Sequence, residues 1–127
     1  MNKEYDTCTK DNCKLSYDLF IDDSLIKLGF IYSNIGTYYY KKLICLLYSR
    51  DMSNININNL CILLAKELKN ISADTIYANI RTTFRRIDKN KTSKNFYDVF
   101  CIPFDDYFIT PKSLAILFMN TLNRIYR

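Results

Sequence analysis

The residues of this chain that could carry out covalent chemistry are five cysteines and two pairs of adjacent aspartates. They are Cys8, Cys13, Cys45, Cys61 and Cys101, with the pairs Asp22–Asp23 and Asp105–Asp106. A cysteine nucleophile needs a neighbouring base, and the sequence has no histidine to supply an imidazole. It also has no Walker loop and no glycine-rich phosphate cradle. We therefore expect a protein without catalytic activity.

The cysteines give little support for metal binding. Cys8 and Cys13 are close enough in sequence to hold a metal or form a redox pair, but no second close pair completes a tetrahedral site. Cys45, Cys61 and Cys101 lie in apolar runs, where a free cysteine behaves as a small buried hydrophobic residue. The odd number of cysteines, without a recognisable secretory signal, predicts reduced thiols, a cytoplasmic location and no metal or other cofactor.

The strongest chemical signal is a cluster of cations that could bind a polyanion. Residues 1–23 carry three lysines and six acids, which gives them a local charge of −3. Because the net charge of the chain is +5, the other 104 residues together carry +8. Residues 81–94 hold six basic residues and one acid, Asp88. This suits nucleic acid or an acidic membrane surface, or else a solvated helix end whose cations complement the helix dipole. No apolar run approaches the roughly 20 residues that span a bilayer, so we expect no membrane segment.

Two consecutive helical patterns position these cations. The first, NNLCILLAKELKN, places four leucines at the spacing of one buried face. After a turn of about three residues, the second, SADTIYANIRTTFRRI, begins at the capping residue Ser72. Its apolar side carries Ile76, Ile80, Phe84 and Ile87. Two short helices joined in this way outline a helix-turn-helix, whose second helix enters the major groove of DNA.

The opposite side of the second helix carries short polar residues and arginines. Arginine can pair with guanine, and the methyl groups of alanine or threonine can contact the methyl group of thymine. The lysines that follow could bind the DNA backbone. The predicted DNA-binding residues are Ser72, Asp74, Thr75, Tyr77, Ala78, Arg81, Thr82, Arg85, Arg86, Lys89, Lys91 and Lys94.

The rest of the chain is also predicted to be helical. Residues 1–20 show no sustained periodicity and are expected to form a flexible arm, followed by one domain over residues 21–127. That domain should contain a short helix capped by Asp22 or Asp23, a long helix from Gly36 or Thr37, a loop at 88–93, a short helix at 95–101 and a last helix after Thr110. With two glycines and two prolines as breakers, we predict an all-α, compact bundle of five or six helices.

The order of these elements resembles a known family, the C-terminal DNA-binding effector domain of the sporulation-initiation response regulator of endospore-forming bacteria. The similar segments are LIKLGF, IGTYYYKKLICLLY, LLAKELKN, SADTIYANIRTTFRRI, NFYDVF and TPKSLAILFMNTL, in that order. The resemblance implies an all-helical domain with the helix over 72–87 in the major groove. It further implies binding to short AT-rich boxes, often as tandem head-to-tail pairs, and control of transcription.

Two departures from the family pattern matter. The family's members carry a phosphoacceptor receiver domain before the effector, whereas the match here begins near residue 21, so we expect a stand-alone effector. The family's recognition helix presents adjacent glutamate and arginine side chains to bases, and those positions are Tyr77 and Ala78 here, while Arg81 is kept. Because a lost bidentate contact removes roughly 1–3 kcal/mol of discrimination at one base, the resemblance implies altered or relaxed specificity.

Three roles fit these observations. The leading one is a sequence-preferring double-stranded DNA-binding protein that acts as a small transcription regulator. The second is an architectural accessory factor that directs a site-specific recombinase on a mobile element. The third is a protein–protein antagonist that pairs with a full-length relative. The expected partners are therefore double-stranded DNA, a second copy in a homodimer or tandem pair, and a recombinase or full-length regulator.

Overall fold

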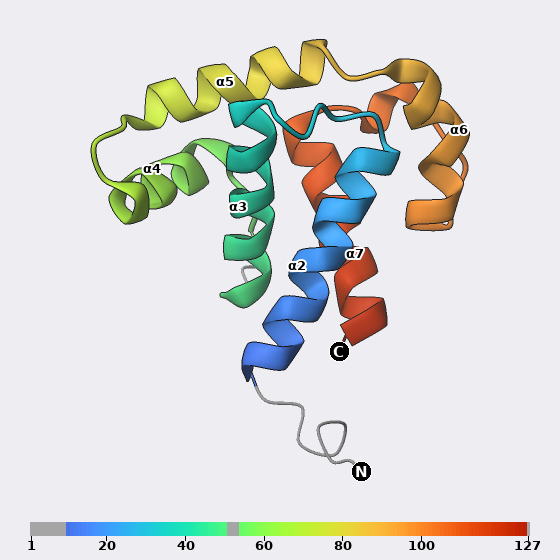
Figure 1. Ribbon diagram of the computed structural model, residues 1–127, viewed down its shortest axis with the longest axis horizontal. Coiled ribbons are helices and arrows are strands. Elements are labelled where there is room, and N and C mark those ends of the chain that lie inside the picture. The colour runs from blue at the N-terminus through green and yellow to red at the C-terminus, as the bar shows by residue number, and fades with distance from the viewer. Residues whose placement is uncertain (1–9, 51–53, 127) are drawn as a thin grey trace.

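The computed structural model describes residues 10–50 and 54–126, and within them every regular element is a helix (Figure 1). The elements are α2 (Lys10–Lys27), α3 (Ile35–Ser49), α4 (Ile57–Leu68), α5 (Ala73–Arg85), α6 (Lys89–Phe100), the short 3-10 helix η1 (Asp106–Phe108) and α7 (Pro111–Tyr126). The prediction of an all-α bundle of five or six helices is therefore confirmed for the described part of the chain.

Helix α3 is the centre of the bundle. It contacts α2, α4, α5 and α7. In Figure 1, α2, α3 and α7 run roughly upright, and α5 lies across their upper ends. Helix α4 lies beneath one end of α5, and α6 descends from the other end. This arrangement leaves the upper side of α5 at the surface of the molecule.

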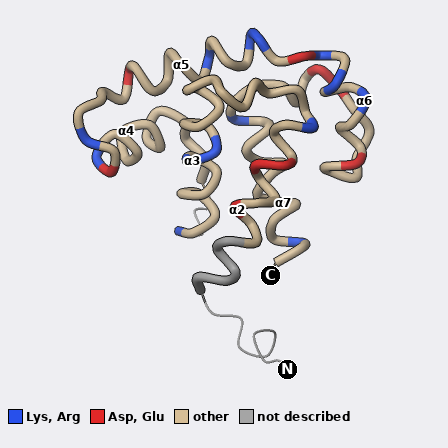
Figure 2. The backbone as a smooth tube through the Cα atoms, in the orientation of Figure 1, with Lys and Arg blue, Asp and Glu red and all other residues tan. Residues whose placement is uncertain are grey.

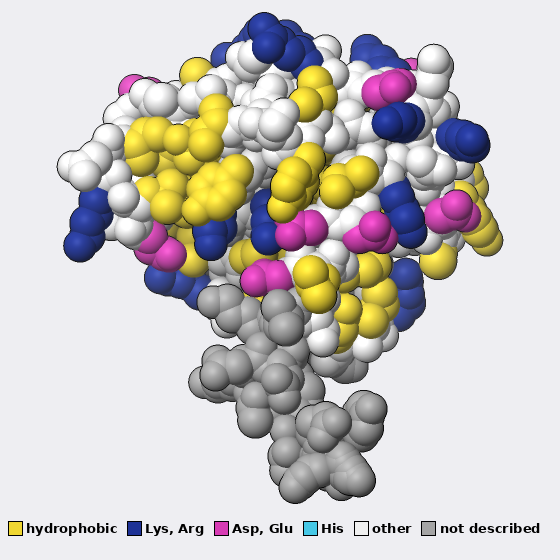
Figure 3. Space-filling view, in the orientation of Figure 1, with side chains coloured by type: hydrophobic (Ala, Val, Ile, Leu, Met, Phe, Trp, Pro, Cys, Tyr) yellow, Lys and Arg dark blue, Asp and Glu magenta, His cyan; other side chains and the backbone are white. Residues whose placement is uncertain are grey.

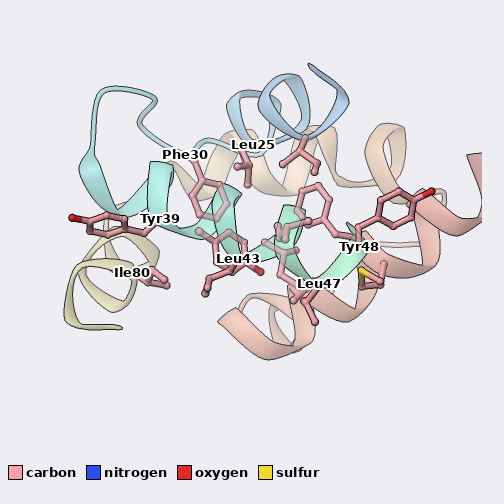
Figure 4. Close-up of a cluster of buried hydrophobic side chains, with 14 of the residues drawn as sticks. Leu25, Phe30, Tyr39, Leu43, Leu47, Tyr48 and Ile80 are labelled. Atoms are coloured by element: carbon pink, nitrogen blue, oxygen red, sulfur yellow. The ribbon is translucent and has the colours of Figure 1, made fainter. Parts of the chain in front are cut away.

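The core forms around α3 because its apolar residues recur at helical spacing. Tyr40, Leu43, Ile44, Leu47 and Tyr48 are buried, as the spacing predicts. Figure 4 shows several of these side chains with others from neighbouring elements. The Tyr40 hydroxyl donates to the main-chain carbonyl of α7's first residue at 2.9 Å, and burial raises the Tyr40 pKa well above its usual value. The Tyr40 ring also packs on the ring of Phe84 in α5, with centroids 4.8 Å apart, so the core reaches directly to α5.

The predicted start of the domain is wrong. Helix α2 begins at Lys10, so the second half of the predicted arm over 1–20 is helical. Asp22 and Asp23 lie inside this helix, where they form ion pairs with lysines, and neither caps it. Tyr17 is buried and packs edge-on against a tyrosine of α3, with ring centroids 4.7 Å apart. The packed domain therefore starts before residue 21.

The predicted loop at 88–93 is also wrong, because it is the first part of α6. The Asp88 carboxylate caps this helix by accepting hydrogen bonds from two backbone N–H groups of the first turn, at 3.0 and 3.3 Å. Thr92 is buried and its hydroxyl donates to the Leu28 carbonyl. The helix therefore begins six residues before the predicted residue 95. The sequence did not reveal this start because a capping aspartate and one buried threonine stabilise it, and its first turn has no periodic apolar residues.

The junction between α5 and α6 is tied to the end of α2. The Asp88 backbone N–H donates to the Gly29 carbonyl at 3.0 Å. Gly29 has φ 95°, and a Cβ there would lie 2.4 Å from the Asp88 carbonyl oxygen. Only glycine suits this combination of left-handed backbone and close approach. The Asn95 side-chain amide adds a hydrogen bond to the Lys27 carbonyl at 2.7 Å, which fixes α6 beside α2.

The structure also describes the apolar character of the helices and the surroundings of the cysteines. No helix in the described residues combines the length and apolar character needed to cross a bilayer. In that same part of the chain, no group of histidine, cysteine or acidic residues could hold a metal ion. Cys61 is buried and Cys45 half-buried, but Cys101 is exposed at the C-terminal cap of α6, contrary to expectation. Of the Cys8–Cys13 pair, Cys8 lies outside the described residues.

Candidate nucleic-acid interface

The predicted recognition helix is α5, which packs directly against α4. A turn over residues 69–72 joins the two helices. Lys69 and Asn70 in this turn both have φ 58°, so two consecutive left-handed residues reverse the chain. The helix pair is compatible with the predicted helix-turn-helix.

The N-terminus of α5 is capped as predicted. The Ser72 hydroxyl oxygen accepts a hydrogen bond from the Thr75 backbone N–H at 3.1 Å, and the two hydroxyls lie 2.9 Å apart. Asp74 is exposed in the first turn, where its carboxylate complements the helix dipole. Because Ser72 and Thr75 are engaged with each other and with the backbone, their first role in the structure is to begin α5.

The inner side of α5 is anchored by a close crossing with α3. A Cβ on Gly36 would lie 2.0 Å from the Thr83 hydroxyl oxygen and 2.3 Å from the Asn79 carbonyl oxygen. The Thr83 hydroxyl donates to Asn34 Oδ1 at 2.8 Å, and the same oxygen accepts from the Gly36 N–H at 2.9 Å. The same side of α5 buries Ile76, Ile80 and Phe84, as predicted, and Ile87 beyond its end is buried too. This crossing determines which side of α5 faces outward.

The outer side of α5 carries its charges unevenly. Figure 2 shows cations in the second half of the helix and a carboxylate near its start, and Figure 3 shows dark blue side chains projecting above it. The exposed predicted residues are Asp74, Thr75, Ala78, Arg81, Arg85 and Arg86, whereas Tyr77 and Thr82 are half-buried. The helix itself ends at Arg85, and Arg86 is its C-cap. The predicted residues from Asp74 to Arg85 therefore lie on a single helix, α5.

Tyr77 contacts Arg81. The Arg81 guanidinium carbon lies 5.7 Å from the centroid of the Tyr77 ring, a cation–π geometry between residues one helical turn apart. The half-buried ring restrains Arg81 on the outer side of α5. The sequence predicted Tyr77 as a DNA-binding residue and as a departure from the family pattern, but its contact with Arg81 was not predicted.

The lysines continue the cationic surface from α5 onto α6. We define this surface as Arg81, Arg85, Arg86, Lys89, Lys91 and Lys94, all of which are exposed. None of these six forms an ion pair with another described residue, whereas three cations elsewhere do. The one acid in the stretch, Asp88, uses its carboxylate to cap α6. The cations therefore lie on two consecutive helices, α5 and α6. The capping residue Asp88 is the signal in the sequence that would have revealed the start of α6.

A groove beside this surface was not predicted. It lies where α5, α6 and residues 104–109 meet, and has a volume of about 430 Å³. Phe84, Ile87, Phe104 and Ile109 supply its apolar lining. Arg85 and Lys89 belong both to the groove and to the cationic surface. Nothing in the sequence pattern indicates the groove, because residues 104–109 are brought to α5 only by the tertiary fold.

The fold and surface together define an all-helical protein with an amphipathic helix pair and a cationic outer side. Comparison with known proteins adds no family or relative to this description. No protein-family model matches the chain, and no curated protein or solved structure matches it. The resemblance in motif order therefore stays a prediction, and the function has to be argued from the surface itself.

Proposed function

We propose that this chain is a sequence-preferring double-stranded DNA-binding protein, acting as a small transcription regulator, with α5 in the major groove. The observation that carries the proposal is the outer side of α5. It is exposed, and it combines short polar residues in its first half with arginines in its second. An α-helix fits the major groove of B-DNA, which is about 12 Å wide. The short polar side chains in the first half of α5 let the helix approach the bases closely.

Within this proposal, Ala78 and Arg81, near the middle of α5, read bases. Ala78 and Arg81 are one turn apart on the exposed side. The Tyr77 ring restrains Arg81, and an arginine held in place loses less side-chain entropy when it pairs with guanine. Ala78 offers a methyl group to a thymine methyl. We expect Tyr77→Ala to alter the preferred sequence in a binding-selection experiment, and an unchanged preference would contradict the role given to this ring.

The C-terminal end of α5 and the first turns of α6 bind the DNA backbone in this proposal. Arg85, Arg86, Lys89, Lys91 and Lys94 are exposed and form no ion pair with a described residue. No such pair has to be broken before these cations contact phosphates. Each neutralised phosphate releases counterions, so affinity should fall steeply as salt rises.

Salt-dependent binding tests the proposal. The measurement is fluorescence anisotropy of an AT-rich duplex from about 50 to 200 mM salt. The Arg81→Ala/Arg85→Ala variant should lower the affinity and reduce the slope of log K against log salt by about 0.9, because Arg85 is the phosphate-binding member of the pair and each lost phosphate contact removes roughly 0.9. Arg50→Ala/Arg124→Ala is the matched control, since it removes the same charge at the far ends of α3 and α7 (Figure 2). This control should keep the wild-type slope.

The alternative roles correspond to other outcomes. No DNA retention even at low salt would overturn the proposal and favour the protein–protein antagonist. A genome-wide binding footprint separates the remaining two, because a transcription regulator should occupy promoters and a recombinase accessory factor should occupy recombination sites of a mobile element. Enrichment that the Arg81→Ala/Arg85→Ala variant retains in full would show that α5 is not the DNA-contacting helix.

A further inference from the structure

We propose that the groove between α5, α6 and residues 104–109 binds a small organic anion with an aromatic body. Its volume of about 430 Å³ falls in the range of small-molecule sites, roughly 300–1,000 Å³. Such sites combine a mostly apolar lining with a few polar groups that orient the ligand. Here four apolar side chains line the groove together with Arg85, Lys89 and Asp106.

The far wall of the groove is anchored in the core. The ring centroids of Phe104 and Phe108 lie 5.4 and 5.8 Å from that of Phe96, which is fully buried. Phe104 is half-buried, so part of its ring remains available to a ligand. Because buried aromatic contacts hold this wall, the groove is preformed, and a planar ligand can stack on Phe104.

The near wall is equally fixed. Phe84 packs edge-on against the rings of Phe30 and Tyr40, with centroids 5.1 and 4.8 Å away. Thr92 also lines the groove, but its hydroxyl donates to main-chain carbonyls and is not free to bind a ligand. The polar groups left to orient a ligand are therefore the charged ones.

The groove holds two cations that form no ion pair with a described residue, whereas the hollow between α3 and α4 and the hollow on α7 each hold one, Lys42 and Lys112. The lysine of the hollow between α2 and α3 is paired with a carboxylate at 2.8 Å, and the arginine of the hollow between α3 and α4 is paired at 3.6 Å. Arg85 and Lys89 have no such partner among the described residues. With the single carboxylate of Asp106, the groove carries a net charge of +1, which complements a carboxylate on the ligand.

Ligand binding would also affect DNA binding. Arg85 and Lys89 line the groove and belong to the cationic surface. An anion bound to them removes two cations from the surface that faces phosphates, so ligand and DNA compete. This competition rests on the proposed function, whereas binding of the anion to the groove does not.

An NMR titration of the full chain tests the groove directly. The probes are 2-naphthoate and its uncharged analogue 2-naphthalenemethanol, added at low salt. Amide shifts should concentrate at residues 84–92 and 104–109, and the carboxylate should bind about fivefold more tightly, as expected for two exposed ion pairs. Equal affinity for the two probes would overturn the proposal, as would shifts centred on the α7 hollow that contains Lys112.

Three variants assign the charges. Arg85→Gln/Lys89→Gln should weaken 2-naphthoate binding about fivefold and leave the uncharged probe unaffected. Asp106→Asn should strengthen 2-naphthoate binding about twofold, because it removes the opposing charge. Lys112→Gln, in the separate hollow, is the control and should change neither. Unchanged 2-naphthoate affinity in the Arg85→Gln/Lys89→Gln variant, with an unchanged melting curve, would refute the site.

A competition experiment links the groove to DNA. If the chain binds the duplex, saturating 2-naphthoate should raise the apparent Kd for DNA in the wild type and have less effect in Arg85→Gln/Lys89→Gln. If the chain binds no DNA, the proposed function fails, and the NMR titration still decides whether the groove binds anions. Naphthoate bound in the groove without any effect on DNA affinity would contradict the competition but not the site.

Discussion

The inner and outer sides of α5 are built in opposite ways. On the inner side, Gly36 lets α3 approach so closely that a single methyl group has no room, and Thr83 and Asn34 share a hydrogen bond across the crossing. On the outer side, the cations form no ion pair with a described residue, and Arg81 is restrained by one ring. The contacts of the inner side therefore hold α5 against α3, whereas the side chains of the outer side remain available to a partner. Substitutions should therefore divide into those that change stability and those that change binding.

Gly36→Ala should have the largest effect on stability. The new Cβ would meet a backbone carbonyl oxygen, which cannot rotate away. We expect a loss of about 2–3 kcal/mol in the free energy of unfolding, after the roughly 0.5–1 kcal/mol that alanine adds to helix stability. Urea unfolding followed by circular dichroism measures it.

A double variant sharpens this test. Gly36→Ala/Thr83→Ala removes the hydroxyl at 2.0 Å but leaves the Asn79 carbonyl at 2.3 Å. It should therefore not recover the stability of Thr83→Ala alone. A Gly36→Ala protein within 0.5 kcal/mol of the wild type would mean that the α3–α5 crossing is looser than described.

Thr83→Val should have the next largest effect. Valine keeps the shape of threonine but cannot donate to Asn34 Oδ1, so one partly buried hydrogen bond is lost. We expect a loss of about 1.5 kcal/mol in the free energy of unfolding. Thr82→Val is the matched control on the half-exposed neighbour and should stay within about 0.5 kcal/mol. Equal losses in the free energy of unfolding for Thr83→Val and Thr82→Val would contradict the proposed difference between the inner and outer sides of α5.

Ser72→Ala tests the N-terminal cap of α5, which belongs to neither the inner nor the outer side of the helix. It removes the hydroxyl oxygen that accepts from the Thr75 N–H, so the helix loses its N-cap. The expected loss is about 1 kcal/mol in thermal or urea unfolding. Ser72→Asp should retain most of the stability because aspartate is an equally good N-cap. A loss of the same size in both variants would mean that capping is not the reason.

Arg81→Ala/Arg85→Ala should have the smallest effect on stability. Both residues are exposed and form no ion pair within the described part of the chain, so unfolding should change by no more than about 0.5 kcal/mol. The same variant is the one expected to lose DNA affinity. If the free energy of unfolding of this variant fell by more than about 1 kcal/mol, the outer side would be part of the packing. Loss of DNA binding would then not identify a contact surface.

The elements that sequence could predict are those with apolar residues at helical spacing. Helix α5 was recognised because Ile76, Ile80 and Phe84 repeat on one side after a capping serine. The first half of α2 was missed because most of its residues are polar, and Asp18 accepts a hydrogen bond from the Cys45 thiol of α3 only in the folded chain. Polar side chains that find partners far away in sequence leave no periodic signal.

The candidate site follows the same rule. The cations could be predicted as a group because they are close in sequence. Gly36 was identified as the start of a helix, but its role in the α3–α5 crossing depends on how two helices meet. The groove also needs Phe104 and Ile109, which follow α6 and reach α5 only through their packing on Phe96 and its neighbours. Contacts between distant segments are the part that local pattern cannot supply.

The link between α2 and α6 has a consequence for motion. Three successive carbonyls, of Lys27, Leu28 and Gly29, accept hydrogen bonds from the α5–α6 junction and the first turns of α6. Opening this junction therefore requires α2 to open with it, so the two segments form one cooperative unit. We expect the Asp88 amide to exchange its hydrogen as slowly as amides inside α6, although it lies between helices. The helix ends that carry the cations on either side of the junction are then held at a constant spacing, so the proposed DNA binding would need no rearrangement of α5 against α6.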